Sequence, residues 1–114
     1  MSAFEMTLLY DYYGKMLTDK QQEYIDMRYN QDLSLGEIAQ ELSISRQAVY
    51  DNLSRAEALL KNMEEKTGCV SRDRALRKAM QSIAQKAETL ISYPDPRVSQ
   101  VAGEILTQAN AFEE

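Results

Sequence analysis

The sequence contains no histidine and no tryptophan, and only one cysteine, Cys69, among 114 residues. Without histidine, a single cysteine can assemble neither the usual zinc-ligand sets nor an internal disulfide. Nucleophilic and acid–base catalysis also lack their commonest residues, because Cys69 has no histidine partner and no glycine-rich phosphate loop occurs. Glu64 and Glu65 are expected to be solvated rather than catalytic. We therefore expect a binding protein, not an enzyme, without metal or other cofactor.

Long apolar runs are missing too. No stretch approaches the roughly 18 to 20 apolar residues that a membrane helix needs. The first residues include Glu5 and Asp11, where a secretory signal would be basic and then apolar. We expect a cytoplasmic protein without membrane insertion. A hydrophobic fraction of 44% is typical of a folded chain with one modest core.

Basic residues are scarce in the first part of the chain. The net charge is −5, and residues 1–69 contain seven Lys and Arg against twelve Asp and Glu, whereas residues 70–114 contain six of each. Binding to duplex DNA draws much of its affinity from neutralised phosphates. The acidic first part therefore opposes non-specific adhesion to nucleic acid.

Glycine and proline are also rare, with four and two residues. Apolar residues recur at helical spacing and no alternating strand-like run appears, so the sequence predicts an all-α fold. Thr18, Ser34, Ser45 and Asp95 are expected to cap helices at their start, and Gly68 to end one. The six expected helices cover about residues 3–16, 18–29, 34–42, 45–67, 71–92 and 96–112.

Apolar stripes predict which sides of these helices pack. The first helix is expected to gather Leu8, Leu9, Tyr12, Tyr13 and Met16 on one side. In the fifth helix the stripe has a 4-3-4-3 spacing typical of a helix packed along another: Leu76, Met80, Ile83, Ala87 and Leu90. The sixth helix carries Val98, Val101, Ala102, Ile105, Ala109 and Phe112. These two stripes could pack on each other, on the first domain or on a second copy, and we expect a homodimer or small homo-oligomer.

Residues 34–67 have the pattern of a helix-turn-helix, in which a short helix, a tight corner and a second helix grip one another. Ser43 stands where many such motifs have glycine. Five apolar residues are expected to lock the pair, with Ile44 plugging the corner: Ile38, Leu42, Ile44, Val49 and Leu53. The alternative is that the two helices are merely a packed corner of an all-helical protein.

The second motif helix supplies the candidate binding residues: Arg46, Gln47, Tyr50, Asp51, Ser54 and Arg55. Helical periodicity turns five residues away from its apolar side: Gln47, Tyr50, Asp51, Ser54 and Lys61. In a DNA reader, Gln47 could bond adenine and Arg46 could bond guanine or a phosphate. Asp51 would face the negatively charged groove unless it accepted a hydrogen bond from cytosine. Tyr50 could stack, bond a phosphate or anchor a protein contact.

A second candidate site is the basic cluster of the fifth helix, formed by Arg74, Arg77 and Lys78. Such a cluster could meet RNA phosphates or an acidic partner helix, and each contact would be screened by salt. The alternative is an ordinary solvated polar surface.

At the helix-turn-helix the sequence resembles known families. "LTDKQQEYIDMRYNQDLSLGEIAQELSISRQAVYDNLSRAEALL", residues 17–60, resembles region 4 of bacterial sigma factors. Many sigma factors have further basic side chains near the positions of Tyr50, Asn52 and Glu57. The combination of "MTLLYDYYGKMLTDKQQEY" with "ISRQAVYDNLSRAEALL" and a two-helix tail resembles the YlxM-like family of small bacterial helix-turn-helix proteins, most specifically at "SRQAVYDN", residues 45–52.

The YlxM-like resemblance implies a sigma-region-4-like helix-turn-helix domain, residues 1–68, followed by a C-terminal helical pair, residues 69–114. It implies a small regulator or accessory factor linked to the signal recognition particle, because the family's genes lie beside those for that particle's GTPase. The expected partners are this GTPase or the particle's RNA. The alternative function is a transcription regulator that reads specific DNA sequences.

Overall fold

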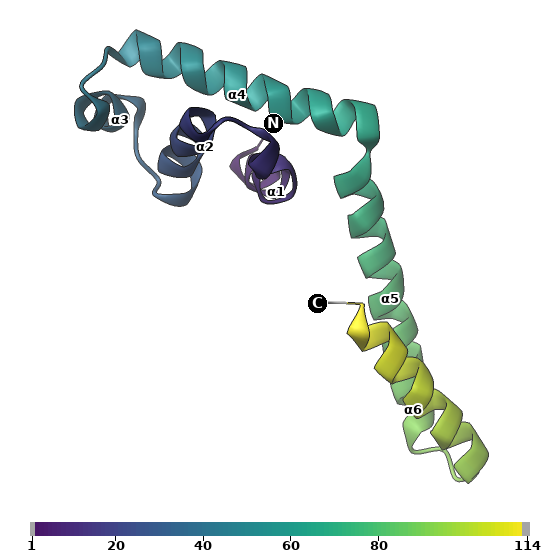
Figure 1. Cartoon of the computed structure of the whole chain (residues 1–114). Helices are drawn as coiled ribbons and strands as arrows, with labels where there is room; N and C mark the ends of the chain where they lie inside the picture. The colour runs from purple at the N-terminus through teal and green to yellow at the C-terminus, as the bar shows by residue number, and fades with distance from the viewer. Residues whose placement is uncertain (1, 113–114) are drawn as a thin grey trace. The chain divides into compact units, whose positions relative to one another are not determined.

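The computed structural model of the chain describes residues 2–112, which form six α-helices and no strand (Figure 1). The helices are α1 (Ala3–Tyr13), α2 (Asp19–Ile25), α3 (Leu35–Leu42), α4 (Arg46–Thr67), α5 (Cys69–Ile91) and α6 (Pro96–Ala111). A 3-10 turn (Gly14–Met16) follows α1, and a π-helical turn (Asp26–Asn30) follows α2. The predicted all-α fold is confirmed.

The chain forms two compact units, the first ending at Val70 and the second beginning at Ser71. The first unit contains α1 to α4, and nearly all of α5 belongs to the second unit together with α6. The functional division predicted at residue 68 stays a prediction.

The long helix α4 organises the first unit, because α1, α2 and α3 all pack against it (Figure 1). Its inner side repeats apolar residues at 4-3-4 spacing, and this side is buried along its length: Val49, Leu53, Ala56 and Leu60. Across from it, α2 and α3 contribute Ile25 and Ile38, both fully buried. One continuous core therefore fixes the side of α4 that faces outward.

The predicted caps are present. Thr18 with Gln21, and Ser34 with Glu37, form reciprocal capping boxes at the starts of α2 and α3. The hydroxyl of Ser45 accepts a hydrogen bond from the Ala48 amide at 3.0 Å, which begins α4. Gly68 ends α4 with a φ of 63°. Asp95 likewise caps α6, which has Pro96 at its first position.

The predicted side of the first helix is partly wrong. Met6, Leu9 and Tyr13 are buried, whereas Tyr12 is 52% exposed and Met16 is 72% exposed. At about 100° per residue, Tyr12 lies well away from the direction of Met6 and Tyr13. The 3-10 turn then changes the helical phase, so that Leu17 is buried in place of Met16.

The corner of the helix-turn-helix also differs from the prediction. Ile44 does not plug it, since its side chain is 37% exposed, and Leu42 is only half-buried. The backbone closes the corner instead. Ser43 adopts the left-handed conformation, with a φ of 56°, and the Ile44 amide donates to the Ala39 carbonyl at 3.0 Å.

In the second unit α5 and α6 run side by side in opposite directions (Figure 1). Among its described residues only alanines are fully buried: Ala87, Ala102 and Ala109. The predicted stripes are therefore only partly covered, because each helix has just one neighbour in this pair. Large apolar side chains between 38% and 54% exposed remain on both helices: Leu76, Ile83, Leu90, Ile91, Val101, Ile105 and Phe112.

Replacing Ser43 with glycine is expected to raise the free energy of unfolding by about 0.5–1 kcal/mol, because an L-residue is strained in the left-handed region that glycine adopts freely. Urea denaturation followed by circular dichroism measures the change. Gly68→Ala is the opposite case, and it should lower the free energy of unfolding by about 1 kcal/mol. If Ser43→Gly destabilised the protein, the serine at the corner would have a stabilising role that its backbone does not explain.

Candidate nucleic-acid interface

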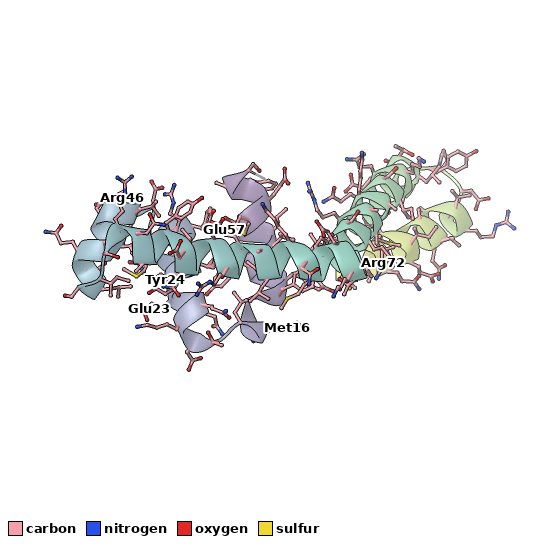
Figure 2. All side chains as sticks on the ribbon, turned by 90° about the horizontal axis from the view of Figure 1, so that it is seen from above. Met16, Glu23, Tyr24, Arg46, Glu57 and Arg72 are labelled. Atoms are coloured by element: carbon pink, nitrogen blue, oxygen red, sulfur yellow. The ribbon has the colours of Figure 1, made fainter. Side chains whose placement is uncertain are left out.

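The first half of α4 presents the candidate binding residues outward. Five of the six are exposed and Ser54 is half-buried; the exposed ones are Arg46, Gln47, Tyr50, Asp51 and Arg55. Arg46 extends outward near the start of the helix (Figure 2). The structure thus brings these six residues together on about three turns of one helix.

The position of this surface is set by the opposite side of the same helix. Val49 is fully buried and Leu53 is 5% exposed, so α4 cannot rotate without breaking the core. In α3, Ile38 and Ala39 are buried in the same core. Together with the Ser45 cap, this packing presents Arg46 and its neighbours on a rigid support.

A hydrogen bond within the surface joins two of the candidate residues. The Gln47 side-chain amide donates to the Asp51 carboxylate at 3.0 Å, across one turn of α4. A base that accepted from Gln47 would have to compete with this bond, and the freed carboxylate would then face the ligand. The pair therefore favours a ligand that offers Asp51 a donor.

The electrostatics of the first unit are unfavourable for duplex DNA. Its sequence contains seven basic against twelve acidic side chains, and Arg46 and Arg55 are the two cations of the candidate surface. Because α4 also carries Asp51 among them, the surface offers little net positive charge. Phosphate contacts, the sequence-independent part of DNA binding, are correspondingly few.

Two tyrosine–carboxylate hydrogen bonds hold α4 in place, and the sequence did not predict either. The Tyr29 hydroxyl donates to the Glu57 carboxylate at 2.5 Å, joining the π-helical turn to the middle of α4. Burial, followed by the hydrogen bond and the charge of Glu57, raises the pKa of Tyr29 to about 12, although Arg28 lies 5.9 Å from the Tyr29 ring and opposes the shift. The two residues are 28 positions apart, so no local spacing could have indicated the pair.

The second bond corrects the expectation for Glu64, which is not simply solvated. Its carboxylate accepts from the Tyr13 hydroxyl at 2.6 Å and from the Val70 amide at 3.0 Å. The Tyr13 hydroxyl also lies 2.6 Å from the Thr67 hydroxyl. Burial raises the pKa of Tyr13, and the bond to Glu64 raises it further. Tyr13 thereby ties α1 to the C-terminal end of α4.

The basic cluster lies apart in the sequence, in the second unit. Arg74 and Lys78 are exposed one turn apart on α5, and Arg77 is half-buried. The Arg77 guanidinium pairs with the Asp73 carboxylate at 2.9 Å, which offsets part of the positive charge of the cluster. Whether these residues bind a ligand stays a prediction.

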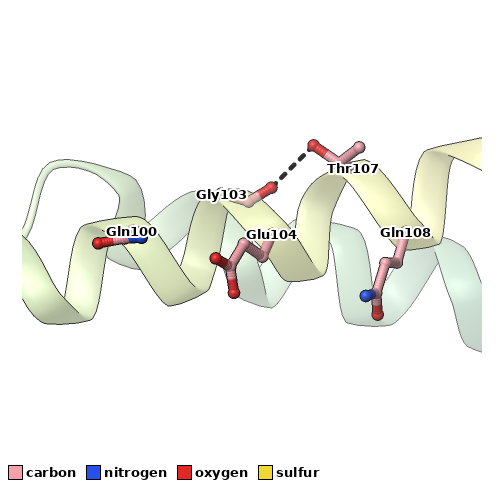
Figure 3. Close-up of a pocket in the computed structure, with 5 residues that line it drawn as sticks. All are labelled: Gln100, Gly103, Glu104, Thr107 and Gln108. Carbon is pink, nitrogen blue, oxygen red and sulfur yellow. Dashed lines mark hydrogen bonds between the residues drawn. The ribbon is translucent and has the colours of Figure 1, made fainter.

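Among residues 2–112 no group of three or more His, Cys, Asp and Glu side chains is placed to hold a metal ion. No helix in that range has the length and apolar composition to span a membrane. A shallow depression on α6 is lined by residues of that one helix: Gln100, Gly103, Glu104, Thr107 and Gln108 (Figure 3). It contains no nucleophile beside a base, so its residues offer no catalytic arrangement.

Comparison with known proteins identifies related chains. A family described as "Putative helix-turn-helix protein, YlxM / p13 like" matches residues 2–93. A UPF0122 protein of Thermoanaerobacter sp. (strain X514) is 46% identical over 101 residues, which are 88% of this chain and 86% of the relative. A UPF0122 protein of Lacticaseibacillus casei (strain BL23) is 43% identical over 94 residues, 82% of this chain and 81% of the relative. One of Desulforamulus reducens is 54% identical over 68 residues, 60% of this chain and 58% of the relative.

The Tyr29–Glu57 bond predicts a loss of stability at high pH. Because folding raises the pKa of Tyr29 from 10.0 to about 12, its contribution is complete below pH 10 and disappears as the pH rises from 10 towards 12. Urea denaturation at pH 9 and pH 11.5 should show a larger decline in the free energy of unfolding for the wild type than for Tyr29→Phe.

Tyr50→Phe is the matched control, because Tyr50 is exposed on α4 and has no hydrogen-bonding role in the core. It should show the same decline as the wild type. Equal declines for the wild type and Tyr29→Phe would mean that the Tyr29 hydroxyl does not make the bond to Glu57 in solution.

Proposed function

Since the chain belongs to the YlxM/p13-like family of helix-turn-helix proteins, we propose that it is a non-enzymatic accessory protein that binds a component of the signal recognition particle. The component is the particle's RNA or its GTPase. The family as a whole suggests nucleic-acid binding, and the candidate surface is the outer side of α4, residues 46–55. The predicted resemblance to this family is confirmed.

The observation that carries the proposal is a helix-turn-helix scaffold with few cations on its reading side. Arg46 and Arg55 are exposed there, beside the carboxylate of Asp51. Each neutralised phosphate contributes about −0.9 to the slope of the logarithm of the binding constant against the logarithm of the salt concentration, so two arginines give a slope of about −2. Proteins that make roughly 6–10 phosphate contacts have slopes several times steeper. A ligand recognised through hydrogen bonds and apolar contacts suits this surface better than a bare duplex.

The link to the signal recognition particle is supported by the YlxM-like resemblance, most specifically over residues 45–52. The cluster of Arg74, Arg77 and Lys78 provides a second surface that suits RNA phosphates or an acidic protein. The two surfaces lie in different compact units, so that separate sets of substitutions address them.

A transcription regulator that reads DNA is the second candidate. It is favoured by the start of α4, where the Ser45-capped helix exposes Arg46 and Gln47 in its first turn. The N-terminal residues of a recognition helix are the ones that contact base edges in the major groove. Two such helices, supplied by two copies, would double the small number of phosphate contacts.

The protein is proposed to act as a homodimer that forms through α5 and α6. Its second unit fully buries only alanines among the described residues, and large apolar side chains remain exposed on both helices. Ordering a helical pair costs conformational entropy that three buried alanines do not offset. A second copy would cover the exposed side chains.

Two double variants separate the candidate functions. If DNA is the ligand, Arg46→Ala with Gln47→Ala should weaken binding to DNA by tenfold or more, at roughly 1–3 kcal/mol per lost base contact. If the signal recognition particle is the partner through α5, Arg74→Glu with Lys78→Glu should weaken binding to its RNA or GTPase instead. Fluorescence anisotropy with labelled DNA, particle RNA and purified GTPase measures each affinity at two salt concentrations.

Lys66→Ala serves as the control for the loss of one exposed cation from α4 outside the candidate surface, and it should leave all affinities within about twofold. Selective DNA binding that survives both double variants would contradict both assignments of the binding surface. Binding to neither particle component would contradict the first proposal.

Replacing Ile83 and Ile105 together by serine should convert the dimer to monomer, because both are exposed on the apolar side of the second unit. Sedimentation equilibrium measures the mass. Gln85→Ser is the control, since Gln85 is an exposed polar residue of α5, and this variant should stay dimeric. A wild-type protein that is monomeric at high micromolar concentration would contradict the proposed dimer.

A further inference from the structure

We propose that, in the homodimer proposed above, α5 of each copy lies across α6 of the other, and that Lys86 of one copy pairs with Glu104 of the second copy. This inference rests on the proposed dimer and goes beyond it, because it states which helices meet and which charges select the arrangement. It depends on the exposed apolar side chains of α5 and α6 and on the charged side chains that flank them.

The exposed apolar residues form one stripe on each helix. On α5 the stripe is Leu76, Ile83 and Leu90, which are separated by seven residues each, and they are 44%, 41% and 43% exposed. On α6 the stripe is Val101 and Ile105, continued by Phe112 directly after the helix, and these residues are 54%, 38% and 39% exposed. Seven-residue and 4-plus-7 spacings both follow the 3.5-residue period of helices that pack lengthwise on a partner.

Both stripes lie on the same side of the helical pair. In α5 the residues turned towards α6 include Met80, Ala84 and Ala87. At about 100° per residue, the stripe is rotated from these residues about the helix axis by roughly a quarter of a turn. In α6 the stripe is rotated from the buried Ala102 and Ala109 about the helix axis by a similar angle and in the same sense. Because the two helices are antiparallel, equal offsets place both stripes on one side.

A second copy is the occupant that fits this side. It presents a two-helix apolar surface of the same width and period, so two copies can close into a four-helix bundle related by a two-fold axis. The stripe positions themselves are all apolar, and the polar residues Lys86, Glu104 and Gln108, each three residues after a stripe residue, lie at the edge of the stripes. An interface of this kind is self-complementary without requiring a differently shaped partner.

Charges beside the stripes select between two arrangements of the dimer: one in which α5 packs on α5 of the second copy, and one in which α5 packs on α6 of the second copy. Lys86 precedes Ala87 on α5 and Glu104 precedes Ile105 on α6, and both side chains are exposed. Glu104 and Gln108 extend from the same side of α6, one turn apart, while the Thr107 hydroxyl is bonded to the Gly103 carbonyl (Figure 3). Neither Lys86 nor Glu104 forms an ion pair among the described residues.

If α5 packed on α5 of the second copy, the two Lys86 side chains would lie beside the α5–α5 contact and the two Glu104 side chains beside the α6–α6 contact. Like charges would then face each other. If α5 crosses α6 of the second copy, each Lys86 faces a Glu104 instead, and the dimer gains two ion pairs. Charges at such flanking positions set the partner choice and orientation of packed helices.

The levels of the two residues along the bundle agree with this pairing. A Cβ atom on Gly103 would lie 3.9 Å from the Ile91 side chain, which fixes the level of α5 against α6. Lys86 lies five residues from Ile91 and Glu104 one residue from Gly103, in the same direction along the pair. At about 1.5 Å per residue their levels differ by about 6 Å, which two long side chains can span. A two-fold axis parallel to the bundle leaves the position of each residue along the bundle unchanged, so Lys86 of one copy and Glu104 of the second copy have this same difference in level.

The test is a charge exchange, measured as the dimer dissociation constant by sedimentation at low salt. Lys86→Glu and Glu104→Lys should each weaken the dimer about fivefold or more, because each change replaces two attractions with two repulsions. The protein with both changes should dimerise like the wild type. Glu88→Lys, an exposed charge change on the same helix, is the control and should have little effect. Circular dichroism verifies that each variant is folded.

A second measurement tests the arrangement without relying on variant stability. In a Cys69→Ser background, Lys86→Cys chains mixed with Glu104→Cys chains should be joined by a short bismaleimide, whereas Lys86→Cys chains alone should not be. Self-linking of Lys86→Cys chains, or a double charge exchange that fails to restore the dimer, would overturn the pairing and leave the dimer intact. A monomeric wild-type protein would overturn both the dimer and this pairing.

Discussion

The burial of one side of α4 is the constraint on which the rest of the first unit depends. Val49 and Leu60 are fully buried near the two ends of that side, and three helices pack against it. Because the helix cannot turn about its axis, the outward direction of Gln47, Tyr50 and Asp51 follows from the core, whereas Arg46 is exposed because it begins the helix. The tyrosine–carboxylate bonds from Tyr29 and Tyr13 then fix α4 at its middle and its C-terminal end.

Most of the fold could be predicted because its signals are local. The Thr18–Gln21 capping box, the Ser45 cap and the glycine after Thr67 each act within a few residues of the helix end they define. The outer side of α4 could be predicted for the same reason, since helical periodicity alone places Gln47 and Val49 on different sides. The candidate site therefore followed from the sequence as a set of positions, while its use as a binding site remains a proposal.

Features that depend on distant parts of the chain could not be predicted. Tyr13 and Glu64 are 51 residues apart, and nothing near either residue indicates the other. The exposure of Ile44 depended on whether the backbone or a side chain would close the corner, a choice that spacing cannot decide. The same holds for the second unit, where periodicity predicted apolar stripes but could not tell how much of each stripe α5 and α6 would cover.

The bond between Tyr13 and Glu64 also has a consequence for the order in which the protein is made. Helix α1 is synthesised before the other helices of this unit, yet the Glu64 carboxylate that accepts from Tyr13, and the Val70 amide that shares this carboxylate, are synthesised more than fifty residues later. Until then Met6 and Leu9 have no completed core to enter. Nascent chains generally fold as whole domains, so the first unit cannot close until the chain has been synthesised through Val70.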